Sequence, residues 1–300
     1  MEPNDISALV IGPAGRSLAQ VAGAPRLSAA RAVPVREIPA VDEQGIARTL
    51  HVPIERPLTL VVDGLEIVTL MTLGAAPEWL VIGYLRNHRL IGGVETVRAV
   101  EVDWTRDVAV VTTRNGAVGA PPATRDNPAT APLGCALGTA FLDVMHRFDA
   151  GTAGTAGSAG SAHPTSHATL LDIIESMRHH DAIHRAAGSV HSCALFRGGE
   201  LWVAVEDVSR HNGVDMVTGF MSLHGVAGAD KILFTTGRLT GEMVMKAAHN
   251  GISVMISRNG TTAMGYDLGL KLGMTLIGRA GNRGYVCYTG ADRIVRDAPS

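Results

Sequence analysis

Strand-like patterns dominate the first half of the chain. Runs rich in β-branched and aliphatic residues predict four strands, at residues 57–62, 65–72, 96–102 and 108–113. Asp63-Gly64 joins the first two runs, and this dipeptide favours a tight hairpin turn. Between the two pairs of strands, Pro77 suits the first turn of a helix. The pattern therefore predicts a small ββαββ unit.

The second half alternates between strand and helix periods. Residues 190–196 and 201–206 predict a hairpin around Gly198-Gly199. Further strands are expected at residues 231–235, 252–256, 274–278 and 285–288, and helices at 168–178, 213–223, 241–249 and 261–272. Strand–helix–strand repetition indicates parallel strands covered by helices. The fold class is α/β, or α+β overall when the first half is included.

Two stretches lack any period and divide the chain. Residues 1–34 are rich in Ala, Gly and Pro and predict a flexible arm. Residues 151–166 consist largely of Gly, Ala, Ser and Thr, which is typical of a flexible linker. We therefore expect a flexible arm, a small α+β domain, a helix with its linker, and a larger domain, at residues 1–34, 35–133, 134–166 and 167–300.

Composition narrows the function classes. The formal net charge is −2 and aromatic residues make up 4%, which disfavours nucleic acid as a partner. No apolar run approaches the roughly 18 to 20 residues of a membrane span, and no signal peptide is evident. The three cysteines are far apart, which excludes a Cys-rich zinc ribbon and a disulfide framework. We expect a soluble, cytoplasmic protein with no membrane contact.

Cys135 is the candidate reactive thiol. It lies where a Gly/Pro/Ala-rich loop gives way to a predicted helix, and a helix start favours the thiolate form. Thiolate is the form that attacks sulfane sulfur. An inert cysteine at a helix start is the alternative, and position alone favours it. Cys193 and Cys287 lie in apolar strands and are interpreted as small buried hydrophobic residues.

A polar run follows the predicted strand at residues 201–206. Asn212 can cap the next helix, with Asp215 three residues later. Capping does not explain the other charged residues of the run, namely Glu206, Asp207, Arg210 and His211. Ligands of open α/β sheets usually bind where strands end, so this run is a candidate binding site.

Two further segments could hold an anion. Gly237 allows close backbone approach and Arg238 offers a cationic fork, just before a helix that Thr240 can cap. Between two later strands the chain places Arg279, Ala280, Gly281, Asn282, Arg283 and Gly284, which suit a phosphate or a guanine base. For both segments an ordinary turn is the alternative.

Histidines give no metal signature. His191 on an apolar strand is more often a satisfied core histidine, and no HExxH spacing occurs. A zinc hydrolase acting on a nucleobase would need H-x-E and P-C-x-x-C, and neither is present. We therefore predict no tightly bound metal.

Several segments, in this order, resemble the FdhD family of formate dehydrogenase accessory proteins. The matching pieces include Glu55-Arg56-Pro57-Leu58, Gly134-Cys135, Gly188-Ser189-Val190-His191, Glu206-Asp207-Val208-Ser209-Arg210-His211-Asn212 and Thr236-Gly237-Arg238-Leu239-Thr240-Gly241-Glu242-Met243. The last two runs together are specific, and the resemblance covers residues 35 to 295 except for the linker.

The resemblance implies a larger domain similar to cytidine deaminases, an α/β/α sandwich. It implies a sulfurtransferase that accepts sulfur from a cysteine desulfurase as a persulfide on Cys135. The sulfur would pass to the molybdenum of a bis(molybdopterin guanine dinucleotide) cofactor, the cargo, before insertion into formate dehydrogenase. A homodimer is also implied. Cofactor contacts are expected from Gly237, Arg238, Arg210, His211, Asn212 and the stretch from Arg279 to Gly284.

The sequence departs from the family pattern in places. The family often has CxxC, whereas this chain has Cys135-Ala136-Leu137-Gly138. One nucleophile is enough for a persulfide, but a two-cysteine relay is not available. A lysine common in the family after the RHN run is Met216 here, and the stretch at Arg279 lacks the common Phe. A non-catalytic chaperone that binds the cofactor without moving sulfur therefore stays open as an alternative.

Overall fold

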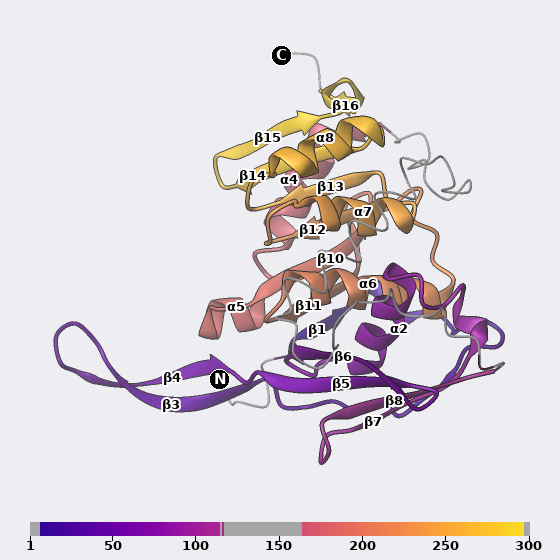
Figure 1. The fold of residues 1–300 in the computed structure, drawn as a ribbon. Coiled ribbons are helices and arrows are strands. Elements are labelled where there is room, and N and C mark those ends of the chain that lie inside the picture. The colour runs from indigo at the N-terminus through magenta and orange to yellow at the C-terminus, as the bar shows by residue number, and fades with distance from the viewer. Residues whose placement is uncertain (1–6, 115, 117–163, 297–300) are drawn as a thin grey trace.

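The computed structural model describes residues 7–114, 116 and 164–296 (Figure 1). Cys135, Gly138 and residues 151–163 of the predicted linker lie outside the described residues, whereas Thr165 and Ser166 at its end form a short strand. The domain boundaries proposed from the sequence therefore remain a prediction.

A seven-stranded sheet forms the larger part of the molecule. Its strands, in spatial order, are β1 (Leu9–Ile11), β11 (Glu200–Asp207), β10 (His191–Arg197), β12 (Ile232–Thr235), β13 (Val254–Ser257), β14 (Thr275–Gly281) and β15 (Gly284–Thr289). The neighbours β12, β13 and β14 are parallel, as strand–helix repetition predicted, and the other pairings are antiparallel. The fold is therefore mixed α/β.

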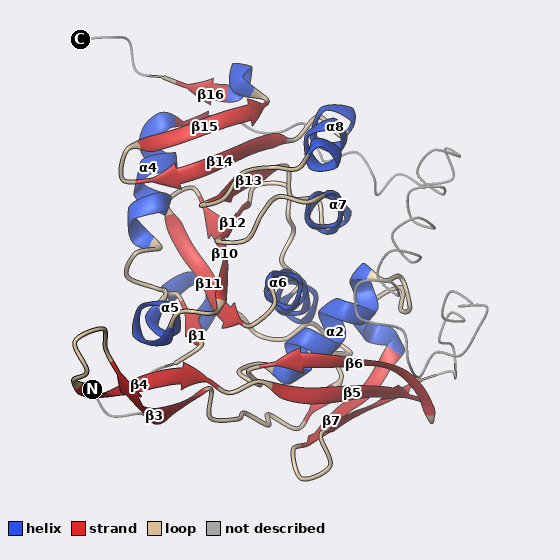
Figure 2. Cartoon of the chain, turned by 60° about the vertical axis from the view of Figure 1, so that its left-hand side comes forward, coloured by secondary structure: helices blue, strands red, loops and turns tan. Residues whose placement is uncertain are grey.

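Helices cover both faces of this sheet (Figure 2). On one face lie α6 (Arg210–His224), α7 (Gly241–His249) and α8 (Ala263–Lys271), and on the other α4 (His167–Ser176) and α5 (Ala182–Ala187). The parallel strands β12 and β13 are buried at every position, which explains their continuous apolar sequence. The short elements β9 (Thr165–Ser166), η3 (Ala291–Arg293) and β16 (Ile294–Val295) complete this part, with β9 paired to β16.

The predicted ββαββ order is present in the first half. A five-stranded sheet has the order β2 (Arg26–Leu27), β7 (Val97–Asp103), β8 (Val108–Thr113), β5 (Arg56–Val62) and β6 (Leu65–Thr72). Helix α2 (Pro77–Asn87) follows β6, with Pro77 in its first turn, and a short 3-10 helix, η2 (Val94–Thr96), leads into β7.

The helices α2 and α6 join the two sheets. A Cβ atom added to Gly83 of α2 would lie 1.6 Å from the carbonyl oxygen of Asp215, and one added to Gly219 of α6 would lie 2.0 Å from that of Trp79. The two helices are therefore in direct backbone contact, which any side chain at these glycines would prevent. Leu80 and Phe220, from the two helices, are fully buried in the same hydrophobic cluster.

The N-terminal region differs from the expected flexible arm. Strand β1 pairs antiparallel with β11, β2 pairs with β7, and α1 (Pro13–Arg16) lies between them in sequence. The reason is that the short apolar run of β1 occupies an open sheet edge. A two-stranded ribbon that the sequence analysis did not predict, β3 (Val35–Val41) and β4 (Ala47–Pro53), projects from the body (Figures 1 and 2). None of the helices in the described residues has the length and apolarity that a membrane crossing needs.

Candidate functional site

Four strands of the large sheet end at the same edge. Strands β11 and β12 are both antiparallel to β10, so they run in the same direction as each other and as β13 and β14. His191, the first residue of β10, lies opposite Asp207, the last residue of β11. The segments that follow these strands therefore meet at one edge, as expected for a ligand site of an α/β sheet.

The run after β11 begins a helix three residues earlier than predicted. Ser209, not Asn212, is the N-cap of α6, and its hydroxyl accepts a hydrogen bond from the backbone N–H of His211 at 3.2 Å. Asn212 lies inside the helix, where its side-chain amide donates to Asp207 at 2.8 Å and to the carbonyl of Met71 at 2.7 Å. The nearby carboxylate and carbonyl need donors, so Asn212 supplies them instead of capping. Asn212 is therefore a buried residue whose side-chain amide is already engaged within the fold, and its cofactor contact stays a prediction.

Asp207 is also structural. It is fully buried and accepts hydrogen bonds from the Thr72 hydroxyl at 2.6 Å and the Leu73 N–H at 3.0 Å, at the end of β6. Burial raises the pKa of Asp207, and these hydrogen bonds oppose that rise. Its other oxygen accepts from the Ser209 N–H at 3.2 Å. Asp207 therefore ties the start of α6 to the smaller sheet.

Glu206 is also structural, and it contacts α5 on the face of the large sheet opposite α6. Its carboxylate accepts the backbone N–H groups of Ile183 at 2.8 Å and His184 at 2.9 Å. These are free N–H groups in the first turn of α5, which an anion satisfies well. Burial raises the pKa of Glu206, and the two backbone donors oppose this. Glu206 therefore holds α5 in place.

Arg210 and Arg238 lie together at this edge. A Cβ atom at Gly237 would lie 2.6 Å from Cβ of Arg210, so the arginine stem packs directly on this glycine. Burial and the charge of Arg238 lower the pKa of Arg210. Within the described residues, neither guanidinium has a carboxylate at ion-pair distance, and Nε of Arg210 is buried with no hydrogen-bond partner.

His191 lies beside these two cations. It is half-buried, and its pKa is lowered by burial and by the charges of Arg210, His184, His211 and Arg238. His191 is therefore less buried than a core histidine, but its ring has a partner, because Nδ1 lies 3.4 Å from the Thr236 hydroxyl. Its lowered pKa favours the neutral imidazole, which leaves Arg210 and Arg238 as the positive charges here. Such a group of positive charges stabilises an anion such as a phosphate.

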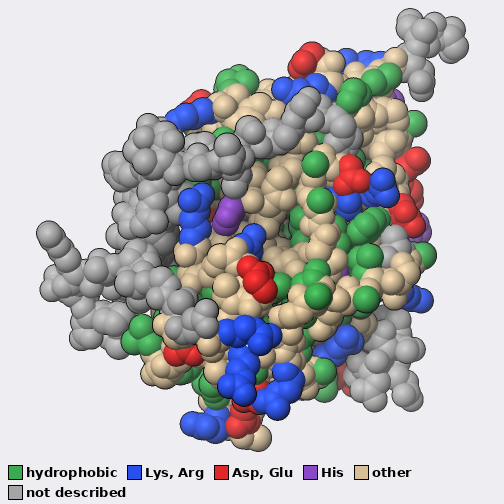
Figure 3. Space-filling view, turned by 90° about the vertical axis from the view of Figure 1, so that its right-hand side faces the viewer, with side chains coloured by type: hydrophobic (Ala, Val, Ile, Leu, Met, Phe, Trp, Pro, Cys, Tyr) green, Lys and Arg blue, Asp and Glu red, His purple; other side chains and the backbone are tan. Residues whose placement is uncertain are grey.

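Positive charge alone does not mark this edge. Figure 3 shows one face of the molecule, where Lys and Arg side chains gather with Asp and Glu among them. In an exposed ion pair such as Arg26–Glu101 the two charges neutralise each other, and the pair contributes little to the stability of the fold. The edge cluster is different because its arginines have no compensating carboxylate in the described part of the chain.

The stretch from Arg279 to Gly284 reaches the same edge through Asn259. The Arg279 N–H donates to the Asn259 carbonyl at 2.9 Å, and the Asn259 side chain donates to the Thr236 carbonyl at 2.7 Å. Arg279 has a left-handed backbone (φ 52°) and an exposed side chain.

The members of this stretch differ in position. Ala280 is buried in the core, because alternate residues of β14 face opposite sides, so it is not a contact residue. Asn282 and Arg283 are exposed at the hairpin turn, between the paired Gly281 and Gly284. Arg279 is therefore the member that the hydrogen bonds tie to the Gly237 turn.

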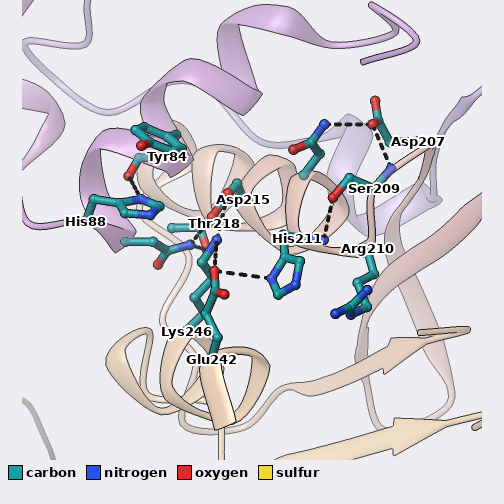
Figure 4. Close-up of polar contacts among 12 residues, drawn as sticks. Tyr84, His88, Asp207, Ser209, Arg210, His211, Asp215, Thr218, Glu242 and Lys246 are labelled. Atoms are coloured by element: carbon teal, nitrogen blue, oxygen red, sulfur yellow. Dashed lines mark hydrogen bonds and ion pairs between the residues drawn. The ribbon is translucent and has the colours of Figure 1, made fainter. Parts of the chain in front are cut away.

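A buried chain of charges lies behind His211 (Figure 4). Nδ1 of His211 lies 3.2 Å from Oε1 of Glu242, which lies 3.2 Å from Nζ of Lys246. Lys246 in turn donates to Asp215 at 2.8 Å, and Asn87 of α2 donates to Asp215 at 2.6 Å. The chain thus connects α2, α6 and α7.

The charges in this chain stabilise one another. Burial opposes the charge on Lys246, yet the carboxylates of Asp215 and Glu242 outweigh it and raise the pKa of Lys246. Burial also opposes the charge on Glu242, but His211 and Lys246 lower its pKa to about 2. Sequence reasoning did not assign Lys246 a role, although its i,i+4 spacing from Glu242 on a helix was a usable signal.

A pocket of about 330 Å³ opens beside this chain, between α2 and α6. Its walls combine polar and apolar groups: Glu55, Leu70, Met71, Tyr84, His88, Val208, Ser209, His211, Asn212, Asp215 and Lys246. His88 stacks on Tyr84, with ring centres 3.9 Å apart. Because His211 also follows Arg210 directly, it lies between this pocket and the edge cations (Figure 4).

The two described cysteines are poor nucleophiles. Cys193 is fully buried, as predicted, and burial raises its pKa to about 12. Cys287 is only partly buried, less than predicted, and burial raises its pKa too. Among the described residues, no group of three or more His, Cys, Asp or Glu side chains is arranged to hold a metal ion.

Comparisons with known proteins agree with the motifs. A curated relative from Geobacillus kaustophilus, named sulfur carrier protein FdhD, is 27% identical over 82% of this chain and 90% of its own length. One of the same name from Bacillus licheniformis is 29% identical over 80% of this chain and 88% of its own. A crystal structure from Desulfotalea psychrophila, described as a formate dehydrogenase accessory protein, matches with a TM-score of 0.65. That match covers 87% of this chain and 98% of the other at 24% identity, so it supports the fold alone.

The family model matches residues 53–295, which is most of the chain and includes every described segment of the candidate site. The chain belongs to the FdhD/NarQ family.

Proposed function

We propose that this protein is a sulfur carrier that supports the maturation of formate dehydrogenase. Its relatives carry the name sulfur carrier protein FdhD, and the family match spans most of the chain. In this proposal a cysteine desulfurase supplies the sulfur and formate dehydrogenase is the client. The protein would act in the cytoplasm as a homodimer.

Cys135 is the proposed sulfur-carrying residue. Its thiolate would attack the outer sulfur of the desulfurase persulfide, and the desulfurase thiolate would leave. The product is a persulfide on Cys135, formed with no net oxidation. The outer sulfur would then pass to the molybdenum of the cofactor, which is the substrate. In this step the S–S bond breaks, Cys135 leaves as the thiolate, and the two electrons that reduce the sulfur to sulfide would come from the molybdenum centre. Cys193 is a poor alternative because it is buried and its pKa is raised to about 12.

The edge of the large sheet is the proposed cofactor site. The observation that carries this proposal is the pair Arg210 and Arg238, two guanidinium groups without a carboxylate partner in the described residues. A dinucleotide brings a pyrophosphate, whose charges such a pair would balance. Exposed Arg279 is close in the backbone network and would contact the phosphate or the guanine end.

Nucleotide binding tests this site directly. Guanosine diphosphate, titrated calorimetrically, should bind the native protein and lose affinity about tenfold or more in Arg238→Ala, since one charge-assisted contact is lost. The matched control is Arg197→Ala, which removes an arginine from the far end of β10, where Asp230 already neutralises it. Equal affinity in Arg238→Ala and the control would contradict the assignment.

Sulfur loading tests Cys135 separately. After incubation with a cysteine desulfurase and L-cysteine, peptide mass spectrometry should find an added sulfur atom on Cys135, and none in Cys135→Ala. Cys193→Ala should load normally because its thiol is buried. Absence of the adduct in native protein that still binds guanosine diphosphate would favour the alternative, a chaperone that binds the cofactor without sulfur transfer. Gly138, in place of a second cysteine, is the observation that keeps this alternative open.

A further inference from the structure

In the part of the chain that the structure describes, one face of the projecting β3–β4 ribbon packs against no hydrophobic core. The two strands pair antiparallel, from Val35 opposite Pro53 at one end to Val41 opposite Ala47 near the turn. Alternation places Ile38, Ala40, Leu50 and Val52 on one face, and Ile46 of the turn extends it. None of these residues belongs to a hydrophobic core cluster of the described chain, and Ile46 and Leu50 are 52% and 47% exposed.

The opposite face of the ribbon is used within the chain. Val35 is buried with Ile183 of α5 in one hydrophobic cluster. Farther out, Glu37 and His51 face each other at 3.5 Å. The opposite face is thus covered at its base, whereas Val41, farther out on that face, is 69% exposed. A two-stranded ribbon on its own is only marginally stable in water, so its uncovered apolar surface favours a partner.

Pro39 disfavours the addition of a partner strand at the outer edge of β3, because it interrupts that edge. The Asp42 N–H donates to the Ile46 carbonyl, and the Ile54 N–H donates to the Pro34 carbonyl. This register means that the backbone N–H and C=O groups of the even-numbered residues of β3 point towards β4. The backbone of Pro39 therefore points outward, where it has no N–H to offer. A partner that avoids this edge can pack on the apolar face.

The charges of the ribbon indicate which partner fits. Its own ion pairs join Arg48 to Asp42 and His51 to Glu37. Arg36 near the base and Glu43 at the tip are exposed and have no ion pair in the described residues. Both charges belong to the same ribbon, at opposite ends, roughly 20 Å apart along the strand.

We propose that this face packs on the same face of a second copy, with the two ribbons antiparallel about a twofold axis. The axis would pass near the middle of β3, so that Ile38 and Leu50 of both copies meet. Arg36 of each chain then faces Glu43 of the other. A twofold contact must be self-complementary, and a ribbon with opposite charges at its two ends fulfils this requirement. The inference rests on the homodimer in the proposed function and assigns its contact surface.

Sedimentation of the full-length protein over a range of concentrations tests the contact. Leu50→Asp should weaken the dimer at least tenfold, because it places a charge in the apolar centre. The matched control is Thr49→Asp, which adds the same charge on the opposite face and should leave association unchanged. Circular dichroism confirms that each variant is folded.

Charge reversal tests the twofold geometry. Arg36→Glu and Glu43→Arg should each weaken the homodimer, because like charges then meet at both ends. An equal mixture of the two variants should restore association, since every contact is again between opposite charges. A purely intrachain role cannot produce rescue by mixing.

Two results would overturn the proposal. One is a native protein that stays monomeric at all concentrations. This holds also if its apolar face then binds the desulfurase or formate dehydrogenase instead of a second copy. The other is a dimer that Leu50→Asp leaves intact or that mixing fails to rescue. Sulfur loading of Cys135 and nucleotide binding in Leu50→Asp report on the proposed function independently, so the two failures can be told apart.

Discussion

The polar residues at the start of α6 fall into two groups with opposite environments. Asp207, Asn212 and Asp215 are buried, and each has several hydrogen-bond partners from distant parts of the chain. Arg210 lies only a few residues away and has no carboxylate partner among the described residues. A buried polar group is tolerated only when it is satisfied, so the first group is structural. An unpaired cation at a sheet edge can bind a ligand.

The largest expected effect comes from breaking the buried group at Lys246. Among the described residues Lys246 is the only cation paired with Asp215, and it also pairs with Glu242. Lys246→Met therefore leaves both carboxylates without this cation. We expect a loss of about 3–5 kcal/mol in the free energy of unfolding, measured in urea. Lys271→Met, at an exposed position of α8, should change stability by less than about 0.5 kcal/mol. Similar losses in both variants would refute the distinction.

A second prediction concerns the pH dependence of the same chain. The pKa of Glu242 is about 2 in the folded protein and 4.5 in the unfolded reference, so its charge stabilises the fold above pH 4.5. That contribution, about 3 kcal/mol, is lost as the pH falls from 4.5 towards 2.

Glu242→Gln isolates this contribution because glutamine cannot ionise. The native protein should exceed the variant in unfolding free energy at neutral pH, and the gap should shrink on acidification. Asp207 and Glu206 have raised pKa values and the opposite pH dependence, but they are present in both proteins and cancel. A gap that stays constant between pH 6 and pH 3 would show that the ionisation of Glu242 does not stabilise the fold.

A third, smaller effect is expected at Asp207. In Asp207→Asn only one oxygen remains, and the new NH₂ group would face either the Thr72 and Leu73 donors or the Ser209 and Asn212 donors. We expect a loss of about 1–3 kcal/mol in urea unfolding. Asp172→Asn, an exposed position in α4, is the matched control and should be near neutral. A neutral result at Asp207 would mean that its hydrogen bonds contribute little.

Much of the larger sheet could be predicted because parallel strands and their helices have clear patterns. The helix at residues 241–249 and the order of the strands after it agree with the structure. The ribbon was missed because Glu37 and Pro39 interrupt β3, and Ala47 to Thr49 of β4 are all exposed. Its pairing depends on residues across a turn and not on a buried face.

The location of the site could be predicted, but the roles of its residues could not. Strand ends next to Arg210, Gly237 and Arg279 indicated a shared edge, which the register of the strands confirms. Whether a polar residue is satisfied depends on partners far away in sequence, such as Thr72 for Asp207 and Asn87 for Asp215. Sequence patterns carry no information about those contacts, so the buried hydrogen bonds of Asn212 were not predicted.

The smallest expected effect on stability, and the sharpest contrast, is at Arg210. Arg210→Ala removes a partly buried cation that is repelled by Arg238 and has no carboxylate partner in the described chain. Folding should therefore lose less than about 1 kcal/mol, and relief of the repulsion offsets part of the lost packing on Gly237. The same variant should bind guanosine diphosphate at least tenfold more weakly, and the affinity of the native protein should fall as salt is added. If instead Arg210→Ala destabilised the fold as much as Asp207→Asn and left nucleotide affinity intact, Arg210 would belong to the structural group, and the edge of the sheet would lose its case as an anion site.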